Sequence, residues 1–157
     1  MPADLDAAVA RVEAAFAGVS RPTNADLLHP DCADDMDIEH LYAVTDWRAL
    51  AGEEVIGGYA ALAFLSAAGF RHFVPAYLLW VLADPESGEA VVDSTVWAFH
   101  AEMYPESLRP FVRSKWALLD PAQRDAVAVF LEAMTPHHAD AGAALAAWRA
   151  WDSGAQT

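Results

Sequence analysis

Residues 62–82, LAFLSAAGFRHFVPAYLLWVL, decide the fold, because this stretch is almost wholly apolar and carries one charged residue, Arg71. It is long enough to span a membrane, but the polar pair Arg71-His72 and Pro75 interrupt it, so we interpret it as buried core. Ser66 can cap a helix that begins after it. Pro75 lacks an N–H and disfavours helix just before it, so we expect two central apolar helices joined at a kink. The polar pair is expected to mark where the stretch reaches the surface.

Helical periodicity extends on both sides of this stretch, because apolar residues recur there with the spacing of one helix face. The further helices that the pattern predicts lie, in chain order, at residues 4–17, 34–44, 53–65, 91–99, 120–134 and 138–151. The strongest start signal is Asp120-Pro-Ala-Gln, which offers an N-cap, a proline at the first helical position and a capping-box glutamine. Residues 91–99 are rich in β-branched side chains, so a short strand near Val91–Phe99 is the alternative there.

The length and the spacing of these elements predict one domain. A chain of 157 residues falls within the usual size of a single domain. No linker, internal repeat or low-complexity tract divides it. The predicted fold class is all-α: a single compact domain over residues 1–157, with about six to eight helices around the kinked central apolar pair.

The chain is strongly acidic, with 23 acidic against 9 basic residues and a formal net charge of −14. Such a surface repels nucleic-acid phosphates, so we expect no nucleic-acid partner. It favours rapid association with a protein whose surface is basic. The alternative is that the charge only keeps an alanine-rich protein in solution.

Two features bear on the compartment. Cys32 is the single cysteine, which excludes an internal disulfide. The N-terminal sequence carries acidic residues where a secretory signal peptide has basic ones, and it lacks a continuous apolar core. We therefore expect a cytoplasmic protein without a membrane partner.

Residues 26–54 are the most charge-biased part of the chain, with nine acidic residues against a single base, Arg48. Within this segment Met36 is expected to face the core. Aromatic residues beside charge are typical of interface anchors. The candidate partner-binding face consists of Asp31, Asp34, Asp35, Asp37, Glu39 and Trp47. The alternative is an ordinary solvated surface.

A metal site is the second interpretation of the same region. His29, Cys32 and His40 carry side chains that bind zinc and related metals, and they lie close together in the sequence. His29-x-x-Cys32 is half of a recognised site, however, and no second Cys or His pair follows at a metal-binding spacing. We therefore predict no resident metal and no cofactor, and keep this site as an alternative.

No catalytic signature is found in the sequence. Gly-x-Ser-x-Gly is absent, and Gly57-Gly58 lacks the lysine and the hydroxyl residue of a phosphate-binding loop. His100-x-Glu102 matches part of a zinc-deaminase motif but lacks its cysteine pair. We predict no catalytic residues, and a binding protein is favoured over an enzyme.

Several segments together resemble a known family. They are VEAAFAGV at residues 12–19, LHPDC at residues 28–32, the apolar stretch 62–82, and FVRSKWALLDPAQRDAVAVFLEAM at residues 111–134. Over residues 12–134 the chain is similar to small, uncharacterised bacterial proteins that are known only as a domain of unknown function. The C-terminal part is also similar to bacterial immunity-type proteins. The resemblance implies no catalytic residues.

The favoured interpretation is a non-enzymatic acidic binding protein of the bacterial cytoplasm, of the immunity or antitoxin type, that neutralises a partner with a basic surface. One alternative is a metal-binding protein or metal-dependent hydrolase that uses His29, Cys32 and His40. The other is a homo-oligomeric structural domain whose apolar helices pack across a two-fold interface.

Overall fold

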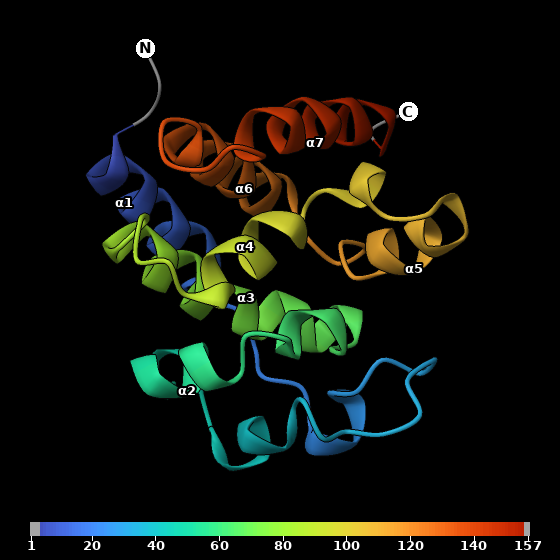
Figure 1. The fold of residues 1–157 in the computed structure, drawn as a ribbon. Helices are drawn as coiled ribbons and strands as arrows, with labels where there is room; N and C mark the ends of the chain where they lie inside the picture. Colours follow the sequence, from blue (N-terminus) through green and yellow to red (C-terminus); the bar gives the residue numbers. More distant parts are fainter. Residues whose placement is uncertain (1–3, 156–157) are drawn as a thin grey trace.

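The computed structural model describes residues 4–155, which contain seven α-helices and no strand (Figure 1). The helices are α1 (Leu5–Phe16), α2 (Gly52–Gly57), α3 (Ala67–Ala83), α4 (Ala90–Trp97), α5 (Arg109–Ser114), α6 (Pro121–Met134) and α7 (Ala141–Ala155). Short 3₁₀ turns lie at residues 24–26, 39–43, 47–49, 61–63, 101–103 and 106–108. The prediction of an all-α domain is confirmed.

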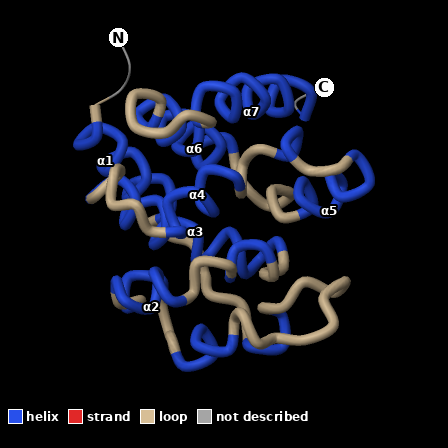
Figure 2. Tube along the Cα trace, in the orientation of Figure 1, coloured by secondary structure: helices blue, strands red, loops and turns tan. Residues whose placement is uncertain are grey.

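Helix α3 crosses the middle of the molecule and organises the other elements (Figure 1). Helices α1, α2, α4 and α6 all contact it, and α6 in turn packs against α1 and α7. Below α3 lies a layer made largely of irregular chain before residue 66, seen as the tan segments in the lower half of Figure 2. Between residues 4 and 155, no helix combines the length and the apolar character that a membrane span requires.

Helix α3 continues through Pro75 as one helix, so the predicted division into two helices is wrong. The missing N–H removes one intrahelical hydrogen bond, but the helix is buried around this point: Phe73, Val74 and Leu78 have no exposed surface. Burial of these side chains offsets the cost of the proline. His72 is also buried, at 1% exposure, so the predicted opening to the surface is confined to the half-buried Arg71.

The helix-start signals in the sequence act as predicted. The Asp4 and Ser66 side chains accept hydrogen bonds from the first turns of α1 and α3. Asp120 and Gln123 form a reciprocal capping box at the start of α6, with N–O distances of 2.8 and 3.0 Å. Gln123 also donates to the Ala15 carbonyl and accepts from Arg71, which ties α6 to the end of α1 and to α3. The segment 91–99 is helical as far as Trp97, where α4 ends, so the favoured helix is confirmed over most of its length and the alternative strand is not found.

Two of the predicted helices are shorter than expected. The segment 53–65 is helical only to Gly57, after which the chain turns and Tyr59 is 47% exposed. The segment 34–44 contains a single 3₁₀ turn, and Met36 is 75% exposed although it was expected in the core. The aspartates of segment 34–44 and the glycine pair of segment 53–65 favour turns over helix, which is the physical reason for the two differences.

Candidate functional site

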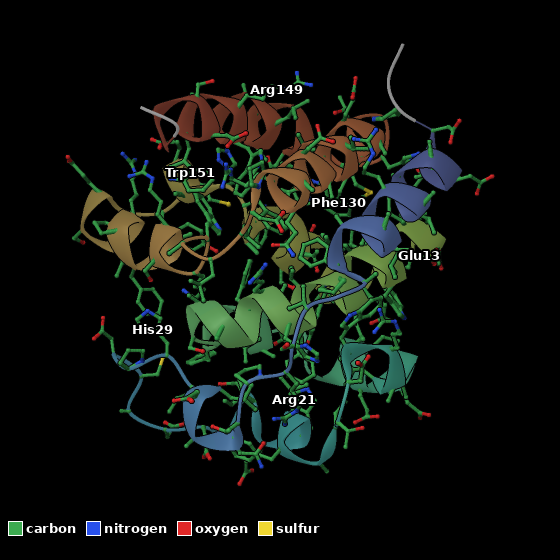
Figure 3. The ribbon with its side chains drawn as sticks, turned by 180° about the vertical axis from the view of Figure 1, so that it is seen from behind. Glu13, Arg21, His29, Phe130, Arg149 and Trp151 are labelled. Atoms are coloured by element: carbon green, nitrogen blue, oxygen red, sulfur yellow. The ribbon has the colours of Figure 1, made fainter. Side chains whose placement is uncertain are left out.

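The irregular layer meets the helices at residues 27–29, which run antiparallel to residues 64–66 just before α3. The His29 N–H donates to the Phe64 carbonyl at 2.8 Å, and the Ser66 N–H donates to the Leu27 carbonyl at 2.7 Å. These bonds hold His29 next to α5. Figure 3 places it on the irregular layer, away from Trp151 of α7.

His29 joins this layer to α5 through Ser114. The distance from His29 Nε2 to Ser114 Oγ is 2.9 Å, and His29 Nδ1 accepts the Asp31 backbone N–H at 3.1 Å. Because Nδ1 is an acceptor, the neutral ring carries its proton on Nε2 and donates it to Ser114. Ser114 in turn donates to the Phe111 carbonyl at 2.6 Å. A serine nucleophile requires the opposite polarity, with the histidine accepting the serine proton, so this contact is structural.

Lys115, next to Ser114, is the single lysine of the sequence and is buried, at 4% exposure. Its Nζ lies 3.5 Å from the centre of the Phe111 ring and donates a long hydrogen bond, 3.4 Å, to the Phe111 carbonyl. Among residues 4–155 no carboxylate forms an ion pair with it. Burial lowers the pKa of Lys115 to about 8. Lysines rarely lie inside proteins without a partner, so this residue is a candidate functional group.

Lys115 lines a cavity of about 210 Å³ beside α5. The side chains around it are mostly apolar and come from the 59–63 turn, α4, the 104–108 segment and α5. They belong to Tyr59, Ala60, Leu62, Ala63, Ser94, Trp97, Ala98, Tyr104, Leu108, Phe111, Val112 and Lys115. Sequence reasoning missed this site, although a lone lysine within the apolar run FVRSKWALL was an available signal.

The acidic loop, residues 31–39, presents most of the predicted partner-binding carboxylates to solvent. Asp31, Asp34, Asp37 and Glu39 are exposed, whereas Asp35 is half-buried. Asp35 accepts a hydrogen bond from the Tyr42 hydroxyl at 2.8 Å, which holds the loop against the 39–43 turn. The exposed Met36 lies in the middle of this loop. The loop is thus a negative surface with one apolar side chain at its centre.

Trp47, the sixth residue of the predicted face, does not belong to this surface. Its side chain is 5% exposed and lies in the core, with Arg48 stacked on the indole ring at 4.5 Å. Its backbone N–H donates to the buried His72 Nε2 at 3.1 Å. The position of Trp47 beside acidic residues in the sequence suggested an exposed anchor, but its side chain belongs to the hydrophobic core. The apolar side chain that is exposed beside these carboxylates is therefore that of Met36, and not that of Trp47 as expected.

The residues of the alternative metal site do not converge. In the part of the chain that the structure describes, no three His, Cys, Asp or Glu side chains are placed to share a metal ion. His40 packs against Gly58, and burial lowers its pKa. Burial raises the pKa of the half-buried Cys32 thiol, which favours the neutral thiol over the metal-binding thiolate. The geometry therefore gives no support to a metal at His29, Cys32 and His40.

Three histidines should make the fold sensitive to mild acid. Burial lowers the pKa values of His29, His40 and His72 below 6.5, so the unfolded chain binds more protons at slightly acidic pH. Their contribution to stability is complete above 6.5 and is lost as the pH falls through the folded pKa values. We expect the melting temperature to fall between pH 7 and pH 5 and to fall less steeply in His72→Gln. Identical pH profiles for the two proteins would contradict this assignment.

The comparisons with known proteins bear on one part of the resemblance in the sequence, the similarity to a family of unknown function. No curated protein and no solved structure is detectably similar to the chain. One family does match, over residues 4–153, which is nearly the whole chain and includes the acidic loop, Lys115 and all of α6. The protein belongs to this family, described as "Family of unknown function (DUF6714)".

Proposed function

We propose that the protein is a non-enzymatic binding protein whose acidic loop captures and neutralises a partner with a basic surface. The observation that carries this proposal is the group of four exposed carboxylates at Asp31, Asp34, Asp37 and Glu39. Within residues 4–155 none of them forms an ion pair with Lys or Arg. The nearest basic residue along the chain, Arg48, is bonded to Asp46 and to the Ala17 carbonyl. The negative charge of the loop is therefore available to a partner.

The loop is also ordered enough to act as a binding surface. His29 anchors its start to α5, and the Tyr42–Asp35 hydrogen bond anchors its middle. Ordering a surface before binding reduces the entropy lost on association. Met36 adds an apolar contact surrounded by charge, which is the arrangement of many interface centres. A toxic domain with a basic surface, held inactive by this loop, is the partner type that best fits such a surface.

Binding is favoured over catalysis by the direction of the hydrogen bonds at His29. The ring donates to Ser114 instead of accepting from it, so the one serine–histidine pair near the loop is not activated. The function proposed here accordingly requires no bond to be made or broken.

Charge reversal in the loop tests the proposal. The variant Asp34→Lys/Asp37→Lys/Glu39→Lys should lose a basic partner that the unchanged protein captures from a lysate of the source cells. Close charge pairs dominate such interfaces, so the affinity for the identified partner should fall by about tenfold or more. Added salt should weaken the unchanged complex as well, because salt screens exposed charges.

The matched control is Asp6→Lys/Glu13→Lys/Glu106→Lys, which changes the net charge equally at exposed positions on other elements. It should retain the partner, and cross-links from the complex should map to residues 31–39. If both variants lose the partner equally, then the net charge of the protein, and not the position of the acidic loop, determines binding. Capture that is unaffected by the loop variant would refute the proposed face.

A further inference from the structure

The geometry points to a small-molecule site that is separate from the acidic loop: we propose that the cavity beside α5 binds a small amphipathic carboxylate, with its apolar body inside and its carboxylate on the Lys115 ammonium. This activity does not depend on the proposed function of the acidic loop. A carboxylic acid with a short alkyl chain or a single ring is the class of ligand that fits.

The Lys115 ammonium has more hydrogen-bond donors than partners. The group has three N–H donors, and within residues 4–155 they find only the Phe111 ring and a 3.4 Å contact to the Phe111 carbonyl. A buried charge is costly unless it is paired. A bound carboxylate would supply both the opposite charge and strong acceptors.

Burial shifts the pKa values of three titratable groups around Lys115 in the direction that favours their neutral forms. Burial keeps the pKa of the Cys32 thiol raised and that of His29 lowered. Burial also raises the pKa of Tyr104. None of these groups is an anion that competes for the ammonium. The Tyr104 hydroxyl forms no hydrogen bond with the described residues, so it can serve as a second donor to a carboxylate.

The size and the lining of the cavity suit a small, mainly apolar ligand. An apolar cavity of about 150 Å³ accommodates benzene, which has six carbon atoms, so a volume of about 210 Å³ holds about eight non-hydrogen atoms. Apart from Lys115, Ser94 and the two tyrosines, most of the lining residues are apolar. Tyr59 and Leu108 line the same cavity and are each 47% exposed, so a ligand would cover apolar surface that now faces water. No arginine lines the cavity, which favours a singly charged carboxylate over a phosphate.

The single lysine allows a direct test in the unchanged protein. Lysine labelled with ¹³C at Cε gives one side-chain resonance, and its pH titration reports the pKa of Lys115. Hexanoate should raise this pKa above its starting value of about 8, and the neutral analogue hexan-1-ol should not. The affinity for hexanoate should fall about tenfold between pH 7 and pH 9, because the ammonium fraction falls by that factor. A resonance that does not respond to millimolar hexanoate would overturn the proposal.

A pair of variants two residues apart, at Arg113 and Lys115, provides the second test. Lys115→Met keeps a side chain of similar length without the charge, so hexanoate binding should weaken at least about tenfold while hexan-1-ol binding persists. The matched control, Arg113→Met, removes a positive charge from α5 outside the cavity and should bind hexanoate normally. Equal hexanoate binding by Lys115→Met and the unchanged protein would refute the site. If Lys115→Met does not fold, the lysine titration decides alone.

Discussion

Replacing Trp148 with alanine should lower the free energy of unfolding by about 3–5 kcal/mol, the range found for large aromatic side chains in protein cores. The Trp148 side chain has no exposed surface, and its Nε1 donates to the Arg124 carbonyl at 3.0 Å. Its ring packs edge-on against Trp116 and Phe99, with centroids 4.9 and 5.4 Å away. Truncation would remove these contacts, open a cavity between α6 and α7, and leave the carbonyl without its partner.

Urea denaturation followed by circular dichroism would measure this loss, and the melting temperature should fall by roughly 10 °C, at 2–4 °C per kcal/mol for a chain of this size. Trp151→Ala is the matched control, since Trp151 lies one turn later on α7 and is half-buried. The free energy of unfolding should fall clearly less in Trp151→Ala than in Trp148→Ala, because less apolar surface returns to water. Equal losses for the two tryptophans would show that α7 is not docked as described.

Replacing Gly58 with alanine should lower the free energy of unfolding by about 1–3 kcal/mol, whereas the same change at Gly57 should be neutral or slightly stabilising. A Cβ on Gly58 would lie 2.3 Å from His40 Nε2 and 2.8 Å from the Glu54 carbonyl oxygen. The His40 ring can shift, but the carbonyl belongs to α2 and cannot move without disturbing that helix. The cost is steric, because φ of −97° at Gly58 is accessible to alanine.

Gly57 supplies an internal control one residue away. A Cβ there would meet nothing within 4 Å, and alanine is the better helix former at the end of α2. Thermal melts of the two variants should therefore move in opposite directions, or Gly57→Ala should not move at all. A destabilised Gly57→Ala beside a native-like Gly58→Ala would contradict the packing of His40 against this turn.

The candidate site shows what sequence patterns predict well and what they miss. Four of the five carboxylates that were expected at the surface of the acidic loop are exposed, because isolated charges are rarely buried, and the fifth, Asp35, is half-buried. The burial of Trp47 and His72 was not predicted, because the two residues meet only in the folded chain. The Trp47 N–H donates to the His72 ring, which lies 25 residues away in the sequence. Lys115 was missed because nothing local distinguishes a lysine that lines a cavity from one that reaches solvent.

The sequence by itself determined where the main helices begin. The caps at Asp4, Ser66 and Asp120 are hydrogen bonds between residues three apart, so the information lies within one turn of chain. Only the tertiary structure decided that α3 runs unbroken through Pro75, and that His29 meets Ser114 beside a cavity lined by the single lysine. These outcomes depend on burial and on contacts between residues as far as 85 positions apart, which no local pattern encodes.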